Sequence, residues 1–138
     1  EGKIEAKVKL ACAPGVSHAF YLVGDRMLPE LDVFLKSDSN ENSISGAYFW
    51  MNGLSKVRKS VSSISGLKFD SKFYILGVEW NEKNIVWTIN GTPYKLQPNT
   101  NPNASLYLVF ASGVRGNADE SKLPAYMEID WVKCWKKG

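Results

Sequence analysis

Two carboxylates stand two residues apart in a short segment that has the pattern of a β-strand. Residues 30–35 read Glu-Leu-Asp-Val-Phe-Leu. Because side chains alternate between the two faces of a strand, Glu30 and Asp32 are predicted to lie side by side on one face. Charged groups cost free energy when they are buried without a use or a partner, so a cleft explains the pair better than a core. The alternative is an outward-facing polar pair on a solvated sheet.

The segments around this pair are predicted to be β-strands. Residues 3–10 alternate charged and apolar side chains, which is typical of a strand with one solvated face. Residues 19–23 are continuously apolar between turn signals, which indicates a strand covered on both faces. Further strands are predicted at 30–35, 46–51, 73–80, 85–89, 92–96, 106–112 and 126–135. With no long amphipathic helix pattern, the sequence predicts one all-β domain, a sandwich of two antiparallel sheets.

The clearest local signal is a hairpin. Asn90-Gly91 separates two strand-like segments, and this pair tolerates the positive φ angles of a type I′ turn. Trp80 and Trp87 lie in well-patterned strands and are predicted to pack inside the sandwich.

The composition excludes several classes of protein. The chain has 138 residues, a normal size for one domain, and its net charge of +3 is dispersed, which argues against nucleic acid as a partner. The densest basic cluster, Lys56, Arg58 and Lys59, is expected in a solvated loop. No segment approaches the roughly 20 apolar residues of a membrane span. We expect a soluble chain from which any export signal has been removed.

Few residues are suited to nucleophilic or metal chemistry. His18 is the only histidine, no nucleophile-elbow motif accompanies it, and no glycine-rich phosphate loop follows a strand. Cys12 and Cys134 are too few for a disulfide framework and lack metal-ligand spacing. They form either one bridge or two buried thiols, and we expect thiols.

Several segments resemble the family 16 glycoside hydrolases, the group that contains laminarinases and lichenases. The likeness follows the order of the family over nearly the whole chain and implies its fold, a concanavalin A-like jelly-roll sandwich. It also implies that the family's usual N-terminal strands have no counterpart in residues 1–138. The segments that carry the resemblance are 2–9, 19–24, 30–34, 78–80, 85–91 and 126–135.

The resemblance assigns roles in the segment 30–35. The family's catalytic strand has Glu-x-Asp followed by a second Glu two or three positions after the Asp. By resemblance Glu30 is the nucleophile of a retaining reaction and Asp32 is its neighbour. The acid/base position is Phe34 in a regular strand or Leu35 in a bulged one, and neither side chain transfers a proton. General acid catalysis contributes about 10² to 10⁴ in rate, so the resemblance implies a vestigial site with Leu35 in the acid/base position.

The resemblance also implies residues for binding. It places Tyr48 and Trp50 on the concave face, where aromatic rings suit the C–H faces of sugars. Phe110 and Ser112 are further candidates for this cleft. The alternative for Tyr48 and Trp50 is that one or both rings fill the core.

A structural calcium site is a further implication of the resemblance. Asp130 corresponds to an acidic ligand, together with a backbone oxygen near Gly2. Calcium takes six to eight oxygens, of which these residues supply two. The alternative is an ordinary hydrogen-bonded Asp130.

We therefore expect a non-catalytic, extracellular or cell-surface domain that derives from family 16 and recognises a β-glucan or galactan-type polysaccharide. The first alternative is an endo-acting, retaining β-glycoside hydrolase with a lost or substituted acid/base. The second is a structural module that mediates protein contacts. Uncovered strand edges would also favour self-association.

Overall fold

The computed structural model describes residues 1–37, 42–53 and 56–138. This part of the chain is almost entirely β, with one short 3-10 helix, η1 (Glu120–Lys122). The strands are β1 (Gly2–Leu10), β2 (Val16–Gly24), β3 (Glu30–Lys36), β4 (Ile44–Asn52), β5 (Lys56–Ile64), β6 (Tyr74–Trp80), β7 (Asn84–Ile89), β8 (Thr92–Pro98), β9 (Leu106–Val114) and β10 (Met127–Lys136). Within the described residues, no helix has the length and apolar character that crossing a membrane requires.

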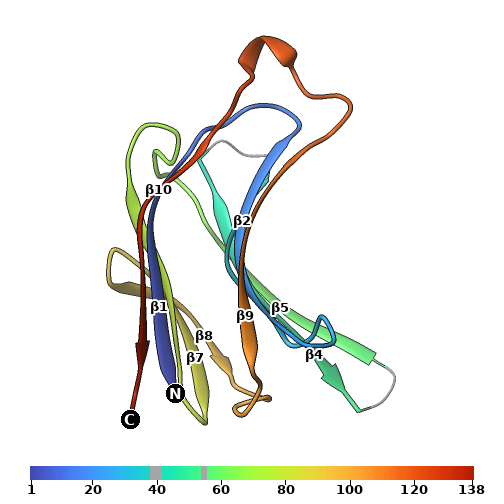
Figure 1. Ribbon diagram of the computed structural model, residues 1–138, viewed down its shortest axis with the longest axis vertical. Helices are drawn as coiled ribbons and strands as arrows, with labels where there is room; N and C mark the ends of the chain where they lie inside the picture. The colour runs from blue at the N-terminus through green and yellow to red at the C-terminus, as the bar shows by residue number, and fades with distance from the viewer. Residues whose placement is uncertain (38–41, 54–55) are drawn as a thin grey trace.

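The strands form two antiparallel sheets that pack face to face. Sheet 1 has the order β10-β1-β6-β7-β8, and sheet 2 has the order β5-β4-β3-β2-β9. Figure 1 shows sheet 1 on the left and sheet 2 on the right, with both chain termini at the same end of sheet 1. The predicted all-β sandwich is confirmed.

The core lies between the sheets and follows from the period-two patterns. In β1 the even-numbered side chains are buried and the odd-numbered ones are half-buried. Trp87 is completely buried, and Trp80 packs against the core while remaining half-buried. Asn90 and Gly91 have φ angles of 47° and 80°, which confirms the predicted type I′ turn between β7 and β8.

One strand was missed by sequence reasoning. Residues 56–64, whose basic cluster was expected in a loop, form β5 and pair with β4 from Ile44↔Ile64 to Asn52↔Lys56. The prediction was wrong because β5 is an edge strand with little buried apolar surface. Lysine, arginine and serine side chains are acceptable at an edge, where they also discourage pairing with other chains.

A β-bulge interrupts β3 directly after Asp32. Asp32 and Leu35 are three positions apart, but they pair with Ala47 and Ser45 of β4, which are only two positions apart. The ladder with β2 shifts at the same place. A bulge adds one residue to one strand and rotates the side chains that follow it. Consequently Leu35 returns to the face of Glu30 and Asp32, although its sequence parity differs from theirs.

The bulge is held from the opposite sheet. The indole Nε1–H of Trp87, in β7, donates a hydrogen bond of 2.8 Å to the backbone carbonyl of Asp32. A bulge disrupts the local ladder, and a buried carbonyl without a partner would cost about 1–3 kcal/mol. The ring fits because residue 46 in the adjacent strand β4 is glycine. A Cβ at Gly46 would lie 2.6 Å from Cδ1 of Trp87 and 2.7 Å from the hydroxyl of Tyr94.

This packing makes Gly46→Ala a test of how tightly the bulge is held. We expect the added methyl group to displace Trp87 and to lower the free energy of unfolding by about 1–3 kcal/mol, as overpacking of a core does. Urea unfolding followed by tryptophan fluorescence measures the change. Gly116→Ala is the matched control, because a Cβ there would meet nothing within 4 Å. Equal stability of the two variants would contradict the account.

Candidate functional site

The two carboxylates predicted from the sequence lie on the face of sheet 2 that points away from sheet 1, which we call the cleft face. Glu30 is half-buried, Asp32 is 7% exposed, and Leu35 is 37% exposed. Phe34, the other candidate for the acid/base position, is completely buried in the core. The bulge therefore aligns Leu35, rather than Phe34, with the carboxylate pair.

The pair shares a hydrogen bond that changes its electrostatics. Burial raises the pKa of Asp32 to about 8, with further upward contributions from the hydrogen bond to Glu30 and from the charge of Glu30. Asp32 is consequently protonated near neutral pH and donates to the Glu30 carboxylate. Both burial and the neighbouring Glu30 thus favour the protonated form of Asp32.

The strand pairings identify the neighbours of the site. Glu30 is opposite Phe49 of β4, and Asp32 is opposite Ala47 of β4 and Tyr21 of β2. Leu35 is opposite small residues on both sides, Ala19 and Ser45. Directly paired residues point to the same face of a sheet. An aromatic ring therefore flanks each carboxylate, whereas the side chains on both sides of Leu35 are small.

Three aromatic residues of the cleft face were missed by sequence reasoning. These are Phe49, Tyr21 and Tyr107, the last of which is opposite Val23 and is 60% exposed. A hydrogen bond to Asp25 raises the pKa of the Tyr107 hydroxyl. The sequence could have placed these rings on the face of Glu30 only if the pairing register of the strands had been known.

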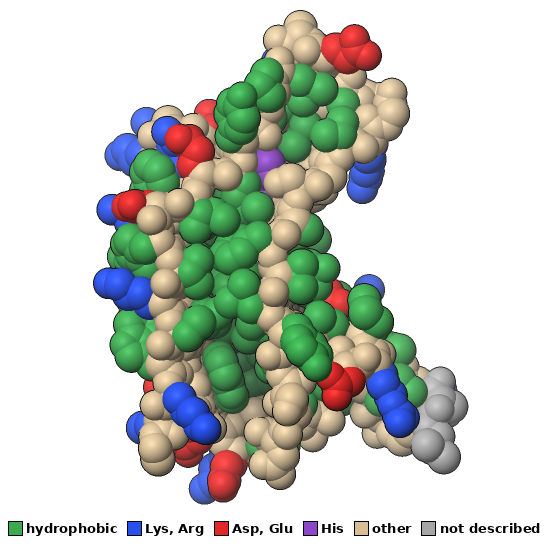
Figure 2. Space-filling view, viewed as in Figure 1, with side chains coloured by type: hydrophobic (Ala, Val, Ile, Leu, Met, Phe, Trp, Pro, Cys, Tyr) green, Lys and Arg blue, Asp and Glu red, His purple; other side chains and the backbone are tan. Residues whose placement is uncertain are grey.

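The cleft face borders open space. In Figure 2 the molecule is hollowed on the right, on the side of sheet 2 that faces away from sheet 1. A hollow of about 520 Å³ lies next to the start of β3 and the end of β4. Its lining residues are Arg26, Leu28, Pro29, Met51, Gly53 and Asn101. Pro29 precedes Glu30 in the chain, so this hollow adjoins the site, although neither carboxylate lines it.

The prediction that Tyr48 and Trp50 line the cleft is wrong. Tyr48 is 2% exposed and belongs to the core, where its hydroxyl bonds to Thr100 (3.0 Å) and Asn101 (3.1 Å). Trp50 stacks on Tyr48 with a centroid distance of 5.1 Å and packs against the core. Both rings lie on the inner face because they alternate with Phe49, which faces the cleft.

Phe110 and Ser112 also lie on the inner face, so their prediction as cleft residues is wrong. Phe110 stacks on the buried Phe20 with a centroid distance of 4.1 Å. The Ser112 hydroxyl lies 2.7 Å from Nδ1 of His18, and Nε2 of His18 lies 3.1 Å from the Ala11 carbonyl. A carbonyl only accepts, so Nε2 carries the proton and Ser112 donates to Nδ1. Burial lowers the pKa of His18, in keeping with this neutral, structural histidine.

The structure does not bring the two predicted calcium ligands together. Gly2 pairs with Lys136 at one end of β10, whereas Asp130 lies at a bulge opposite Lys7 and Val8, toward the other end. The Asp130 carboxylate forms an ion pair of 3.3 Å with Lys7. The described residues contain no group of three His, Cys, Asp or Glu side chains that could hold a metal ion. The ion pair accounts for Asp130.

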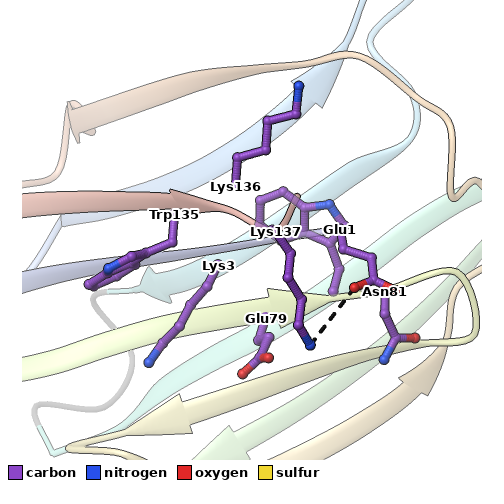
Figure 3. Close-up of a pocket in the computed structure, with 9 residues that line it drawn as sticks. Glu1, Lys3, Glu79, Asn81, Trp135, Lys136 and Lys137 are labelled. Atoms are coloured by element: carbon purple, nitrogen blue, oxygen red, sulfur yellow. Dashed lines mark ion pairs between the residues drawn. The ribbon is translucent and has the colours of Figure 1, made fainter.

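A separate hollow of about 200 Å³ lies at the end of sheet 1 where β1 begins. Figure 3 shows Trp135 and Lys3 on one side of it and the ion pair between Lys137 and Glu1, at 3.8 Å, on the other. Gly2 belongs to this hollow, but Asp130 and the carboxylate pair do not. It is therefore distinct from the candidate site.

Neither cysteine forms a disulfide bridge. Cys12 is half-buried, and Cys134 is exposed on β10. The expectation of thiols rather than a bridge is confirmed, but the expectation that both are buried is wrong, because Cys12 is only half-buried and Cys134 lies on the edge strand β10.

Comparison with known proteins places this architecture in a family. The model of the glycosyl hydrolases family 16 matches residues 2–133. A beta-glucanase from Fibrobacter succinogenes is 27% identical over 154 residues, which cover 98% of this chain and 43% of that protein. The clotting factor G alpha subunit of Tachypleus tridentatus is 27% identical over 157 residues, which cover 98% of this chain and 23% of that protein.

A solved structure has the same fold. The laminarinase from Rhodothermus marinus superimposes with a TM-score of 0.81 at 22% identity, over 96% of this chain and 64% of that chain. The chain belongs to glycosyl hydrolase family 16. It spans less than half the length of the two relatives named above.

The raised pKa of Asp32 predicts a pH-dependent cost to stability. The carboxyl pKa rises from 3.8 in the unfolded chain to about 8 in the folded one, so the folded state binds more protons and stability falls as pH rises through this window. We expect Asp32→Asn to remove this decline and to raise the free energy of unfolding at pH 8 by on the order of 1–2 kcal/mol.

Urea unfolding at pH 5 and pH 8 measures this effect as the difference between the wild type and the variant. Taking the difference cancels the titration of His18, which has the opposite sign. Asp130→Asn is the control, because its side chain is 51% exposed. The same pH dependence in the wild type and in Asp32→Asn would contradict a buried, protonated Asp32.

Proposed function

We propose that this chain is a carbohydrate-binding domain derived from family 16, which recognises a β-glucan or galactan-type polysaccharide without cleaving it. One observation carries the proposal: the bulge in β3 puts Leu35 on the cleft face in line with Glu30 and Asp32. A site for retaining hydrolysis needs a second carboxyl group that protonates the leaving oxygen. Leucine in this position leaves the nucleophile without its partner.

The remaining groups suit binding. The Glu30 carboxylate accepts hydrogen bonds from sugar hydroxyls, while Asp32 keeps it oriented by donating to it. The Phe49 ring, opposite Glu30, offers an apolar face to the C–H side of a sugar ring. Leu35 adds an exposed apolar contact. Because the side chains beside it are small, a pyranose can approach the sheet closely.

The ligand class and the location are part of the proposal. A beta-glucanase and a laminarinase are among the similar proteins, which supports a β-glucan as the first choice. A domain that binds such a polymer belongs outside the cell or on its surface. A galactan-type polysaccharide is the broader alternative.

A second candidate is an endo-acting β-glycoside hydrolase that has lost or substituted its acid/base. It is favoured by the hydrogen-bonded pair of Glu30 and Asp32, which keeps the nucleophile and its neighbour in place. The two candidates differ in whether the rest of the cleft still supports chemistry.

Binding is tested by affinity electrophoresis in gels that contain laminarin, lichenan, xyloglucan, agarose or carrageenan, with a reducing-sugar assay on the same mixtures. We expect retardation in at least one β-glucan or galactan gel, with no release of reducing ends. Phe49→Ala should weaken the affinity about tenfold, because a lost stacking contact is worth about 1 kcal/mol or more.

Phe73→Ala is the matched control for that variant. Phe73 is an exposed ring that contacts Lys7 and Lys9 on sheet 1, away from the cleft face. It should leave retardation unchanged. Released reducing ends from the wild type would refute a binding-only domain, and no retardation in any gel would favour a structural module.

Leu35→Glu separates the two candidates. The binding-only proposal predicts that this variant still releases no reducing ends, because the rest of the cleft no longer supports hydrolysis. The second candidate predicts that it gains cleavage of a β-glucan that Leu35→Gln lacks, since glutamine fills the position but transfers no proton. Gain of activity that Glu30→Gln abolishes would establish the second candidate.

A further inference from the structure

The two sheets leave a furrow open along one side of the sandwich. β9 and β10 are the last strands of sheet 2 and sheet 1, and each has one edge without a partner strand among the described residues. They lie on the same side of the molecule (Figure 1), and Figure 2 shows apolar side chains between them. A hollow of about 210 Å³ in this furrow is lined by residues of both strands, among them Leu106, Leu108 and Cys134, and by the core residues Ile4 and Leu22.

The furrow exposes side chains that belong to the core by register. Ile129 and Val132 of β10 pair with the buried Val8 and Ala6, yet they are 40% and 38% exposed. Leu108 of β9 pairs with the buried Leu22, yet it is 42% exposed. An apolar row of this kind, on the inner side of an edge strand, indicates an interaction surface.

The opposite side of the sandwich is closed by contrast. There Lys95 of β8 reaches across to β5, and its ammonium group donates to the hydroxyls of Ser60 (2.6 Å) and Ser62 (3.4 Å). Lys95 is 7% exposed and also lies over the Trp87 ring, 5.0 Å from its centroid. Polar side chains thus bridge the sheets at one edge, and nothing comparable spans the furrow in the part of the chain that the structure describes.

The chemistry of the furrow defines its occupant. An unpaired strand edge presents backbone N–H and C=O groups, while the floor beside it is apolar. An extended polypeptide with alternating apolar side chains matches both features. Its backbone forms hydrogen bonds with the free strand edge, and its inward side chains cover the apolar floor of the furrow. Similar proteins also contain more polypeptide: the superposition on the Rhodothermus marinus laminarinase covers 96% of this chain but 64% of that one.

We propose that the furrow takes an extended polypeptide strand from outside residues 1–138, which adds to the free edge of β10. The bulge at Asp130 divides β10, and the longer uninterrupted segment is Trp131–Lys136. The strand pairs there and lays its apolar side chains over Leu106, Leu108 and Ile4. This docking is independent of the proposed carbohydrate site, which lies on the opposite face of sheet 2.

The chain supplies both a probe and a reporter for the test. The probe is a synthetic peptide with the sequence of Gly2–Leu10, which is β1 and already pairs with β10 along its other edge. The reporter is the exposed thiol of Cys134, and the half-buried thiol of Cys12, outside the furrow, is the internal control. Alkylation of each thiol in the wild-type chain is followed by mass spectrometry.

We expect the peptide at millimolar concentration to slow alkylation of Cys134 several-fold, to leave Cys12 unchanged, and to slow amide exchange over Trp131–Lys136. A control peptide with lysine in place of Ile4 and Val8 should do neither. No slowing, or equal slowing by both peptides, would overturn the proposal. So would a dimer in sedimentation whose Cys134 is protected without peptide, because a second copy would then fill the furrow.

Discussion

The hydrogen bond from the Trp87 indole to the Asp32 carbonyl is the interaction on which the candidate site depends. It joins the two sheets at the one place where β3 departs from regular pairing. Without a donor from sheet 1, the bulge would leave a buried carbonyl unsatisfied, and a regular strand would be favoured. A regular strand would turn Phe34 toward the cleft and Leu35 into the core. The chemistry of the cleft face therefore depends on a side chain of the opposite sheet.

The same packing buries the Asp32 carboxyl group, which lowers the stability of the fold. Asp32 lies in a region so poorly hydrated that its pKa rises to about 8, and its proton is shared with Glu30. Functional sites often retain such unfavourable groups, because a chain selected only for stability would replace them. A carboxylate pair kept at this cost beside an inert leucine supports the proposal that binding persists where proton transfer has been lost.

Sequence patterns predicted the elements well and the faces less well. Alternation in β1, the Asn-Gly turn and the segment containing Glu30 and Asp32 were sufficient to predict the sandwich and the carboxylate pair. The family resemblance placed Tyr48 and Phe110 on the wrong face. Period-two alternation could not correct this, because their strands are apolar on both faces and the pattern does not show which side chains point inward. The choice between Phe34 and Leu35 depended on the bulge, which is stabilised by the long-range contact with Trp87. Local sequence does not encode such a contact.

The central claim is that ligands meet the molecule on the cleft face beside Leu35. Methyl NMR of the wild-type chain, titrated with a laminarin oligosaccharide, tests it most directly. The account predicts shifts of the methyl signals of Leu35, Ala19 and Ala47, with no change at Ile129 and Val132 in the furrow. Shifts confined to the furrow or to sheet 1, with the Leu35 methyls unaffected at saturation, would contradict it.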